Sequence, residues 1–432
     1  MKTVDEHISD IQNSVRVLTA RRQPLAAAQG CVLAVDVRAT VALPGFDNAA
    51  MDGYAVRAAD VEQATPEAPV RLPVTGEIAA GAARVTPVEP GTAVRIMTGA
   101  PFPLGADTVI QLEWTDGGTE TVAVHRPAPR GLHIRRAGED IAPGDLVLPA
   151  GALLGAAQIG LLAAVNVARP PVHPRPRVAV LSTGSELVDV GTAIGPGQIV
   201  DSNSHAVAAA AREAGCEVRR LTGVPDDPAE FSAVLRAVLP EVDAVVTTGG
   251  VSVGAHDVVK EALAATGEVR FERIAMQPGK PQGFGVIDGV AVFTLPGNPV
   301  SALVSFELFV RPALRRMRGL PGPDRARPLV TVADRLTSPP GKRSFPRVRV
   351  GYGADGALVA HSAGGQGSHH MSTLAGANAL LVVPEDVTQV EAGDRLTAIL
   401  LASQEADAPL AEAVRGAPDL AVAGISALGA NA

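Results

Sequence analysis

The sequence has few cysteines, few aromatic residues and no excess of positive charge. Its two cysteines, Cys31 and Cys216, lie far apart with no second Cys or His at metal-ligand spacing, which argues against a disulfide framework and a zinc site. Aromatic residues make up only 3% of the chain, whereas stacking surfaces for nucleic acids need rings to receive the bases. The net charge of −8 disfavours a general phosphate-backbone binder. We therefore expect no nucleic-acid partner, and any anionic ligand must be held by local features.

Neither a signal peptide nor a membrane span is expected. The first seven residues are polar and acidic and lack the basic-then-apolar order of a secretory signal. Residues 151–168 are nearly all apolar, but Gln158, Asn166, three glycines and the Arg-Pro-Pro sequence at 169–171 favour a buried helix over a spanning one. Together with the scarcity of cysteine, this predicts a cytoplasmic protein without a membrane partner.

What the chain does have is length, apolar residues and many turn formers. Its 432 residues, 47% of them hydrophobic, favour several globular domains, and the 45 glycines and 35 prolines predict many turns. We expect an α/β multidomain protein in which residues 1–45 and 141–175 form a helical N-terminal domain with a small β domain, residues 46–140, inserted between them. A doubly wound α/β domain at 176–325 and a C-terminal β-barrel-like domain at 326–402 follow. The Ala-rich tail, 403–432, is expected to be disordered or a marginal helix.

Local patterns predict the elements of the first half. We expect helices at 4–18, 25–28 and 153–168, a strand at 32–41, and β-domain strands at 70–74, 92–97, 107–111 and 121–125. In the second half strands and helices alternate, as in a doubly wound sheet. The expected strands are 177–182, 217–223, 243–248, 270–276 and 290–295, and the expected helices are 204–214, 228–238, 256–265 and 299–317.

Three loops with glycine follow strands of this α/β domain. They are Leu181 to Glu186, Thr247 to Gly254 and Leu295 to Ser301. Glycines let backbone N–H groups approach an anion closely, and helix N-termini add partial positive charge. Each loop alone could be an ordinary turn, but three at successive strand ends of one sheet predict an oxyanion or nucleotide site.

Carboxylates stand beside these loops at Glu186, Asp201, Asp226, Asp227 and Asp257. Asp227 precedes a proline and is expected to cap a helix, which leaves Asp226 spare. Carboxylates next to an oxyanion site suggest Mg²⁺, which prefers oxygen ligands and bridges to phosphates. Solvated surface acids are the competing explanation for each of them.

Longer motifs give the chain a family resemblance. It resembles the molybdopterin molybdenumtransferases, the molybdenum-insertion enzymes related to the C-terminal domain of gephyrin, up to about residue 402. The motifs that carry the resemblance are FDNAAMDGYAVR (46–57), MTGAP (97–101), RRAGEDI (135–141), STGSEL (182–187), GQIVDSNS (197–204), TTGGVSVGAHD (247–257), PGKP (278–281) and LPGNPVSA (295–302).

The resemblance implies a homodimer whose ligand site in the α/β domain is completed by the β insertion of the partner. It also implies the reaction: molybdate and adenylylated molybdopterin are converted to molybdenum cofactor with release of AMP, assisted by Mg²⁺. The alternatives are a scaffold of the gephyrin type, which would not need the retained acids, and a tungstate-inserting relative.

Functional positions follow from the matching motifs. The resemblance implies catalytic roles for Asp52, Thr98, Asp140, Glu186, Asp226 and Asp257, and Mg²⁺ ligation by Asp226, Asp257 and Glu186. It implies ligand contacts for Ser182, Thr183, Gly184, Ser185, Asp201, Ser202, Asn203, Gly249, Gly250, Val251, Ser252, Gly254, Lys280, Pro296, Gly297, Asn298, Pro299 and Ser301.

Two positions depart from the family pattern. Many relatives have a lysine where this chain has Gln277, so one cationic contact to the oxyanion is expected to be missing. Another lysine-favoured position is Arg273, which keeps the charge but changes its geometry. We expect Lys280 and Arg273 to be the cations that hold molybdate.

Overall fold

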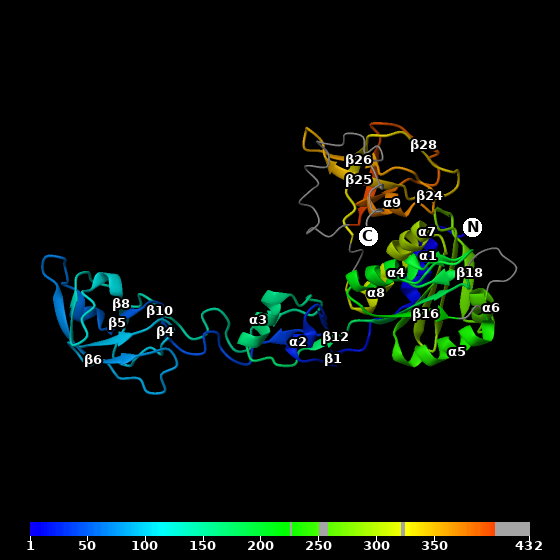
Figure 1. The fold of residues 1–432 in the computed structure, drawn as a ribbon. Coiled ribbons are helices and arrows are strands. Elements are labelled where there is room, and N and C mark those ends of the chain that lie inside the picture. Colours follow the sequence, from blue (N-terminus) through cyan, green and yellow to red (C-terminus); the bar gives the residue numbers. More distant parts are fainter. Residues whose placement is uncertain (225–226, 250–257, 321–324, 402–432) are drawn as a thin grey trace, which may run out of the picture. The chain divides into compact units, whose positions relative to one another are not determined.

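The computed structural model of the chain divides into two compact units (Figure 1). It describes residues 1–224, 227–249, 258–320 and 325–401. Unit 1 combines Met1–Thr19 with His173–Ala432, and unit 2 is Ala20–Val172. Residues 1–19, which the sequence analysis grouped with residues 20–45, therefore belong with the C-terminal half of the chain. The predicted tail, 403–432, lies outside the described residues.

Unit 1 is built on a six-stranded sheet in the order β16-β13-β17-β21-β20-β18. The first four strands are parallel, and β20 and β18 run antiparallel to them. Their bounds are β13 (Arg177–Thr183), β16 (Glu217–Val224), β17 (Ala244–Thr248), β18 (Val269–Arg273), β20 (Pro281–Ile287) and β21 (Val290–Leu295). The short pairs β14 (Leu187–Val188) with β15 (Ile199–Val200), and β19 (Met276–Gln277) with β24 (Arg343–Ser344), lie beside it.

Helices cover both faces of this sheet (Figure 1). One face packs on α1 (Val4–Ser14), α4 (Ser202–Glu213), α7 (Pro299–Ser305) and α8 (Arg311–Met317). The other packs on α5 (Pro228–Val238) and α6 (Val258–Ala264), with the 3-10 turn η3 (Leu239–Glu241). Alternate residues of β13 supply the two cores: Val178 and Val180 face the first set, Ala179 and Leu181 the second. The predicted doubly wound architecture is confirmed.

The long helix predicted at 299–317 is present, with a π-helical turn η4 (Phe306–Val310) between α7 and α8. Pro312 stands in the first turn of α8 and has no N–H to donate to the preceding turn, which accounts for the local widening. The bounds predicted for α5 and β21 match those observed. Strand β20 was not predicted, because two glycines interrupt the apolar pattern of PQGFGVI.

Helix α1 is shorter than predicted and ends at Ser14. A capping box begins it, in which the Thr3 side chain accepts from the backbone N–H of Glu6 and the Glu6 carboxylate accepts from Thr3. Val4 and Ile11 are buried in the core of unit 1, and Leu18 donates its N–H to Met317 O at 2.8 Å. The N-terminal segment therefore completes the α/β core.

The C-terminal part of unit 1 is a closed barrel in the order β22-β26-β25-β27-β29. Its strands are β22 (Leu329–Val332), β25 (Arg347–Tyr352), β26 (Leu358–Ser362), β27 (Ala379–Val382) and β29 (Arg395–Leu400), joined by β23 (Leu336–Thr337), β28 (Gln389–Val390) and α9 (Met371–Ala375). Val330, Val348 and Leu381 are among its core residues. This agrees with the β-barrel-like domain expected there.

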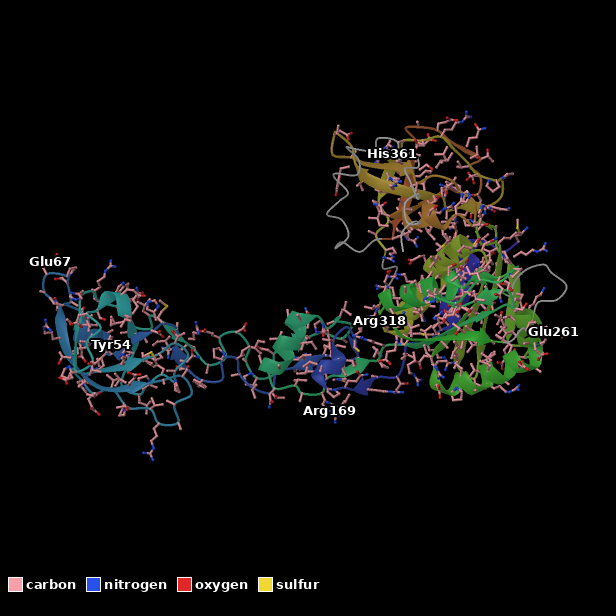
Figure 2. The ribbon with its side chains drawn as sticks, in the orientation of Figure 1. Tyr54, Glu67, Arg169, Glu261, Arg318 and His361 are labelled. Atoms are coloured by element: carbon pink, nitrogen blue, oxygen red, sulfur yellow. The ribbon has the colours of Figure 1, made fainter. Side chains whose placement is uncertain are left out.

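Unit 2 contains a five-stranded sheet in the order β8-β5-β7-β6-β9. Its strands are β5 (Gly53–Val56), β6 (Val70–Ile78), β7 (Ala93–Ile96), β8 (Thr108–Gln111) and β9 (Thr121–Val124), with 3-10 turns η1 (Ala58–Val61) and η2 (Leu112–Trp114). Four strands were predicted. The fifth, β5, was not predicted, because it follows directly on the turn-forming residues of FDNAAMD. Tyr54 of β5 is fully buried and donates its Oη–H to Gly118 O (Figure 2).

The remainder of unit 2 is a small layer of short elements around its own apolar core. Leu33, Val37, Leu154 and Leu162 are among the core residues. The elements are α2 (Leu25–Ala28), α3 (Ala156–Ala164), β1 (Arg21–Arg22), β2 (Val32–Leu33), β3 (Val37–Arg38), β4 (Asn48–Ala49), β10 (Ile134–Arg135), β11 (Leu146–Leu148) and β12 (Pro171–His173). The single strand expected at 32–41 is thus two short strands, and α3 is shorter than the expected 153–168. Over the described part of the chain, no helix has the length and apolar character needed to cross a membrane.

Candidate functional site

Three loops meet at the carboxyl edge of the sheet in unit 1. From β13 the chain crosses to β16 on one side and later returns to β17 on the other, so the strand order reverses between β13 and β17. Ligands of doubly wound folds bind at such a reversal. A Cβ built on Gly249 would lie 3.6 Å from Thr183 O, and one built on Gly297 would lie 3.6 Å from the Cα of Gly249. The loops after β13, β17 and β21 therefore converge, as the sequence predicts.

A buried hydrogen-bond relay supports the loop after β13. Asp201, only 3% exposed, caps α4 by accepting from Ser204 N at 3.0 Å. Its Oδ2 also accepts from the hydroxyls of Ser182 and Ser204, each at 2.5 Å. Because the Ser182 proton is committed to Asp201, Ser182 can accept from a ligand but not donate to its phosphate. Asp201 therefore fixes Ser182, at the end of β13, relative to the first turn of α4.

Glu186 is the exposed carboxylate of this loop. Gly184 has φ +144°, and a Cβ built there would lie 2.6 Å from Glu186 Oε2, so the carboxylate is folded over the glycine. Ser185 beside it is exposed as well. Gly184 thus leaves room for a carboxylate at the mouth of the crevice, where Glu186 can meet a cation or a ligand donor.

The loop after β21 leads into α7. Asn203, in the first turn of α4, donates its amide to Gly297 O at 2.7 Å and ties this loop to α4. Asn298 is the N-cap of α7 without a side-chain cap bond, and Pro299 occupies the first turn. Gly297 and Asn298 are exposed, whereas Pro296 and Ser301 are buried, and Ser202 of α4 is exposed. Gly297 and Asn298 therefore offer polar groups to the crevice, and the buried Pro296 and Ser301 hold the loop in place.

Six of the predicted site residues lie outside the described residues: Asp226, Gly250, Val251, Ser252, Gly254 and Asp257. Asp227 is described, and it caps α5 as predicted by accepting from Ala229 N and Glu230 N, each at 2.9 Å. Within residues 1–224, 227–249, 258–320 and 325–401, no three His, Cys, Asp or Glu side chains gather closely enough to hold a metal ion. Mg²⁺ ligation by Glu186, Asp226 and Asp257 therefore remains a prediction.

The strand pairing puts the predicted cations at the same edge of the sheet. β20 is antiparallel to β21, so its first residue, Pro281, lies at the carboxyl end of β21, and Lys280 directly precedes it. Arg273 pairs with Pro281 at the end of β18. Lys280 is half-buried and Arg273 is exposed. Both cations thus lie at the same edge of the sheet as the three loops, and their binding of an oxyanion remains a prediction.

Gln277 opens onto a cleft between the sheet and the barrel. β19, which contains Gln277, pairs with β24, and Phe345 N donates to Gln277 O at 2.8 Å. The cleft of about 530 Å³ is lined by Gln277 and Pro278 and, from the C-terminal domain, by Arg335, Arg347 and Gln366 among others. Gln277 therefore shares this cleft with two arginines.

Arg347 is the functional candidate that the sequence analysis missed. It is 1% exposed, and its Nη2 donates to Gly365 O at 2.8 Å and to Gly367 O at 3.1 Å. No carboxylate pairs with it among the described residues, and its Nε has no hydrogen-bond partner there. Burial lowers the pKa of this guanidinium, which nevertheless stays charged. A buried cation without a counter-ion that lines a cleft favours an anion as the missing partner.

The three motifs of unit 2 also come together. Asn48 pairs with Arg135 and bridges to Pro101, so FDNAAMDG, MTGAP and RRAGED share one end of the β domain. Asp52 is exposed, and its Oδ1 accepts from Thr98 N at 2.6 Å and from the Thr98 hydroxyl at 2.7 Å. These bonds, the backbone one first, lower the pKa of Asp52. Asp140 is exposed at the same end. Asp52 is thus a pre-oriented carboxylate with a free oxygen.

Three family models match consecutive parts of the chain. "MoeA N-terminal region (domain I and II)" matches residues 2–166, "Probable molybdopterin binding domain" matches residues 179–316, and "MoeA C-terminal region (domain IV)" matches residues 330–401. The second covers the doubly wound sheet and its crevice. Fold and site together define a multidomain protein of the MoeA class.

Relatives narrow this assignment. The chain is 48% identical to molybdopterin molybdenumtransferase 2 of Mycobacterium tuberculosis over 92% of this chain and 98% of the relative. It is 38% identical to molybdopterin molybdenumtransferase of Haemophilus influenzae over 86% and 92% of the respective chains. The crystal structure of a molybdopterin biosynthesis MoeA protein from Pyrococcus horikoshii matches with a TM-score of 0.77 and 32% identity, covering 93% of this chain and 99% of that one. The chain belongs to the molybdopterin molybdenumtransferase family, transferases of molybdenum cofactor biosynthesis.

Proposed function

We propose that this protein inserts molybdate into adenylylated molybdopterin and releases AMP, giving molybdenum cofactor. The observation that carries the proposal is the convergence of three glycine-containing loops at the strand reversal, in a unit that also contains a cleft lined by Arg347, for which the described residues supply no carboxylate partner. Loop amides suit the phosphates of the nucleotide, and the cations suit a second, separate oxyanion. One site for a phosphorylated ligand beside one for an oxyanion is what a two-substrate insertion requires.

The roles of the side chains follow from their protonation and exposure. Ser182 accepts hydrogen bonds from the ligand, because its own proton is held by Asp201. Exposed Glu186 fits Mg²⁺ by the chemistry of its donor atoms, and we assign it to the metal with Asp226 and Asp257. Bound there, Mg²⁺ would neutralise the phosphates and the departing AMP. Lys280, Arg273 and Arg347 hold molybdate, with Gln277 as a neutral donor.

We further propose that the active protein is a cytoplasmic homodimer in which unit 2 of the partner completes the crevice. Support comes from Asp52, which Thr98 holds in an exposed position through Oδ1. Its Oδ2 has no hydrogen-bond partner among the described residues of unit 2. A carboxylate oriented in this way suits proton transfer or cation binding in a site that another surface closes.

The test is a turnover assay with purified protein, adenylylated molybdopterin, Mg²⁺ and molybdate, in which AMP is measured. We expect AMP release that depends on molybdate and is abolished by Glu186→Gln. AMP release that is absent, or unaffected by omitting molybdate, contradicts the proposal. Replacing molybdate with tungstate, alone and in competition, shows which oxyanion the site prefers.

A further inference from the structure

Arg220 lies just behind the crevice and joins two of its parts. It is on β16, the edge strand, on the face that packs against α4. Its Nη2 donates to both carboxylate oxygens of Asp189, at 3.1 and 3.0 Å, and its Nη1 donates to Asp189 Oδ1 at 3.0 Å. The same Nη1 donates to Ser204 Oγ at 3.0 Å. One guanidinium therefore holds a loop carboxylate and a helix hydroxyl together.

Ser204 connects Arg220 to the first crevice loop. The Ser204 hydroxyl donates to Asp201 Oδ2, which also accepts from Ser182 at the end of β13. A continuous chain of bonds thus runs from Arg220 through Ser204 and Asp201 to Ser182. Ser204 and Asp201 are buried, so water does not compete for these bonds.

Asp189 connects Arg220 to the segment that follows Glu186. Residues 187–200, here called the strap, are closed at the base by the pairing of β14 with β15 and by the bond from Ile199 N to Glu186 O at 2.8 Å. In the described part of the chain, the side-chain bonds that leave the strap go from Asp189 to Arg220 and to His205 Nε2. Glu186 is therefore attached to a strap whose side-chain bonds to the rest of the domain are made chiefly with Arg220.

We propose that Arg220 is a positioning residue for the ligand crevice, because it fixes Glu186, through the strap, relative to Ser182, through the buried relay. The proposal rests on the proposed function for the identity of the ligand, a nucleotide-linked pterin, which Arg220 does not itself touch. Three bonds to one carboxylate and a fourth to a hydroxyl require the planar five-donor fork of arginine, which lysine cannot reproduce. Loss of this geometry is expected to weaken ligand binding and, because Glu186 is assigned to Mg²⁺, to slow AMP release as well.

The neighbouring Arg219 provides a matched control. It points to the opposite face of β16, where its Nη1 pairs with Glu241 at 2.5 Å, and both side chains are more than half exposed. Arg219→Gln removes the same charge from the same strand without touching the strap or the relay. Differences between Arg220→Gln and Arg219→Gln therefore report on position and not on net charge.

The experiment compares wild type, Arg219→Gln, Arg220→Gln and Arg220→Lys in AMP-release kinetics and in amide hydrogen exchange of residues 187–204. For Arg220→Gln we expect KM for adenylylated molybdopterin to rise and kcat to fall, each by about tenfold, because Glu186 is misplaced, and strap amides to exchange faster. Arg220→Lys should recover part of both effects. If Arg220→Gln matches Arg219→Gln in KM and exchange, the proposal is overturned.

Two further measurements distinguish failure of the positioning role of Arg220 from failure of the proposed function. Asp189→Asn, at a half-exposed position, removes the charge and one of the two acceptor oxygens and so weakens the same bonds from the strap side. It replaces Arg220→Gln should that variant fail to fold. Faster strap exchange in Asp189→Asn supports the proposal, and unchanged exchange overturns it. If wild type releases no AMP, the proposed function fails while amide exchange still decides whether Arg220 positions the strap.

Discussion

The role of a buried arginine in this protein depends on the groups that surround its charge. Arg318, labelled in Figure 2, is 8% exposed and donates its Nη1 to Ala214 O, the C-cap of α4, at 2.6 Å. There the cation meets the negative end of a helix. Arg347 is more deeply buried and meets only neutral carbonyls. Arg318 therefore has a structural partner in the helix end, whereas the charge of Arg347 is available to an anionic ligand.

No sequence pattern distinguishes Arg347 from its neighbour Arg349. RSFPRVRV reads as an ordinary alternating strand, in which Arg347 and Arg349 are equivalent, but Arg347 is buried and Arg349 is exposed. Both side chains lie on the same face of β25, and the difference arises because the loop at 364–367 covers the end of the strand that contains Arg347. Ser182, Glu186 and Asp52 could be predicted because their motifs are local, whereas Arg347 depends on contacts distant in sequence.

His7 gives the protein a predictable acid sensitivity. It is 2% exposed against Phe309, and burial, followed by the charge of Lys2, lowers its pKa from 6.5 to about 4. Its Nδ1 lies 3.4 Å from Glu272 Oε2, too far for a strong bond, and Lys2 occupies Glu272 and Asp10. Between pH 6.5 and 4 the His7 side chain is protonated in the unfolded chain but largely neutral in the folded protein. Stability should therefore fall by about 2 kcal/mol from pH 7.5 to pH 5.

The measurement is denaturant unfolding of wild type and His7→Leu at both pH values, with the unfolding of unit 1 followed. The variant should lose less stability on acidification than wild type by about that amount. An equal loss in both proteins would assign the acid sensitivity to other groups.

Asp52 should respond to its neighbour in a graded way. Thr98→Val removes the hydroxyl donor but keeps the backbone N–H, which is the larger cause of the lowered pKa of Asp52. We expect the pKa of Asp52 to rise yet remain below its ordinary value, as measured by carboxyl NMR titration. Thr92→Val, at a distant hydroxyl bonded to Glu89 O, serves as the control and should leave Asp52 unchanged.

At the scale of elements, the sequence predicted what local chemistry determines. Helix α5 and the helix from 299 to 317 begin at Pro228 and Pro299, and both proline starts could be recognised. Strands β5 and β20 were missed because each is glycine-containing and is held by its neighbours. A Cβ on Gly53 would lie 1.9 Å from Ile110 O, and one on Gly283 would lie 1.8 Å from Thr294 Oγ1. Such glycines mark close strand approach, which only the assembled sheet reveals.

The adjacent carboxylates at the start of α5 should separate by role. Asp227→Ala removes the cap that satisfies Ala229 N and Glu230 N, at a cost of about 1 kcal/mol, while Asp227→Ser should retain most of the stability. Neither change should alter AMP release by more than about twofold. Asp226→Asn is expected to abolish AMP release with unchanged thermal stability. Loss of turnover in Asp227→Ser would contradict this division of roles.

At the scale of the whole molecule, a shared site predicts complementation between inactive variants. Asp52→Asn alters unit 2 and Glu186→Gln alters unit 1, so each homodimer should lack an intact site. In a mixed dimer of the two, one of the two sites would combine unaltered residues. Equal mixing should therefore restore about a quarter of wild-type AMP release, because half of the dimers are mixed.

Subunit exchange must be verified by native mass spectrometry. If mixed dimers form and remain as inactive as the parents, each site belongs to one chain. Mixing two variants of the same unit, Asp52→Asn with Thr98→Val, is the control and should restore nothing beyond the residual activity of the second.

The barrel ends before the tail, which predicts that the tail is dispensable. β29 ends at Leu400, and Leu401 N donates to Asn378 O at 2.8 Å, so the barrel is closed by that point. The family match also ends at residue 401. Deletion of residues 403–432 should leave the thermal midpoint and AMP release within error of wild type. A fall in either would give the tail a function that the family match does not cover.

The insertion of unit 2 within unit 1 imposes an order on biosynthesis. All of unit 2 leaves the ribosome as one continuous stretch, Ala20–Val172, and can fold as it emerges. Helix α1 cannot, because it packs against η4 and α8 of the same core, which are synthesised about 300 residues later. At about 5–20 residues per second, the apolar side of α1 waits roughly 15 to 60 s for its partners. Helix α1 is thus synthesised first but is among the last helices to pack. During that interval chaperones have an exposed apolar segment to bind.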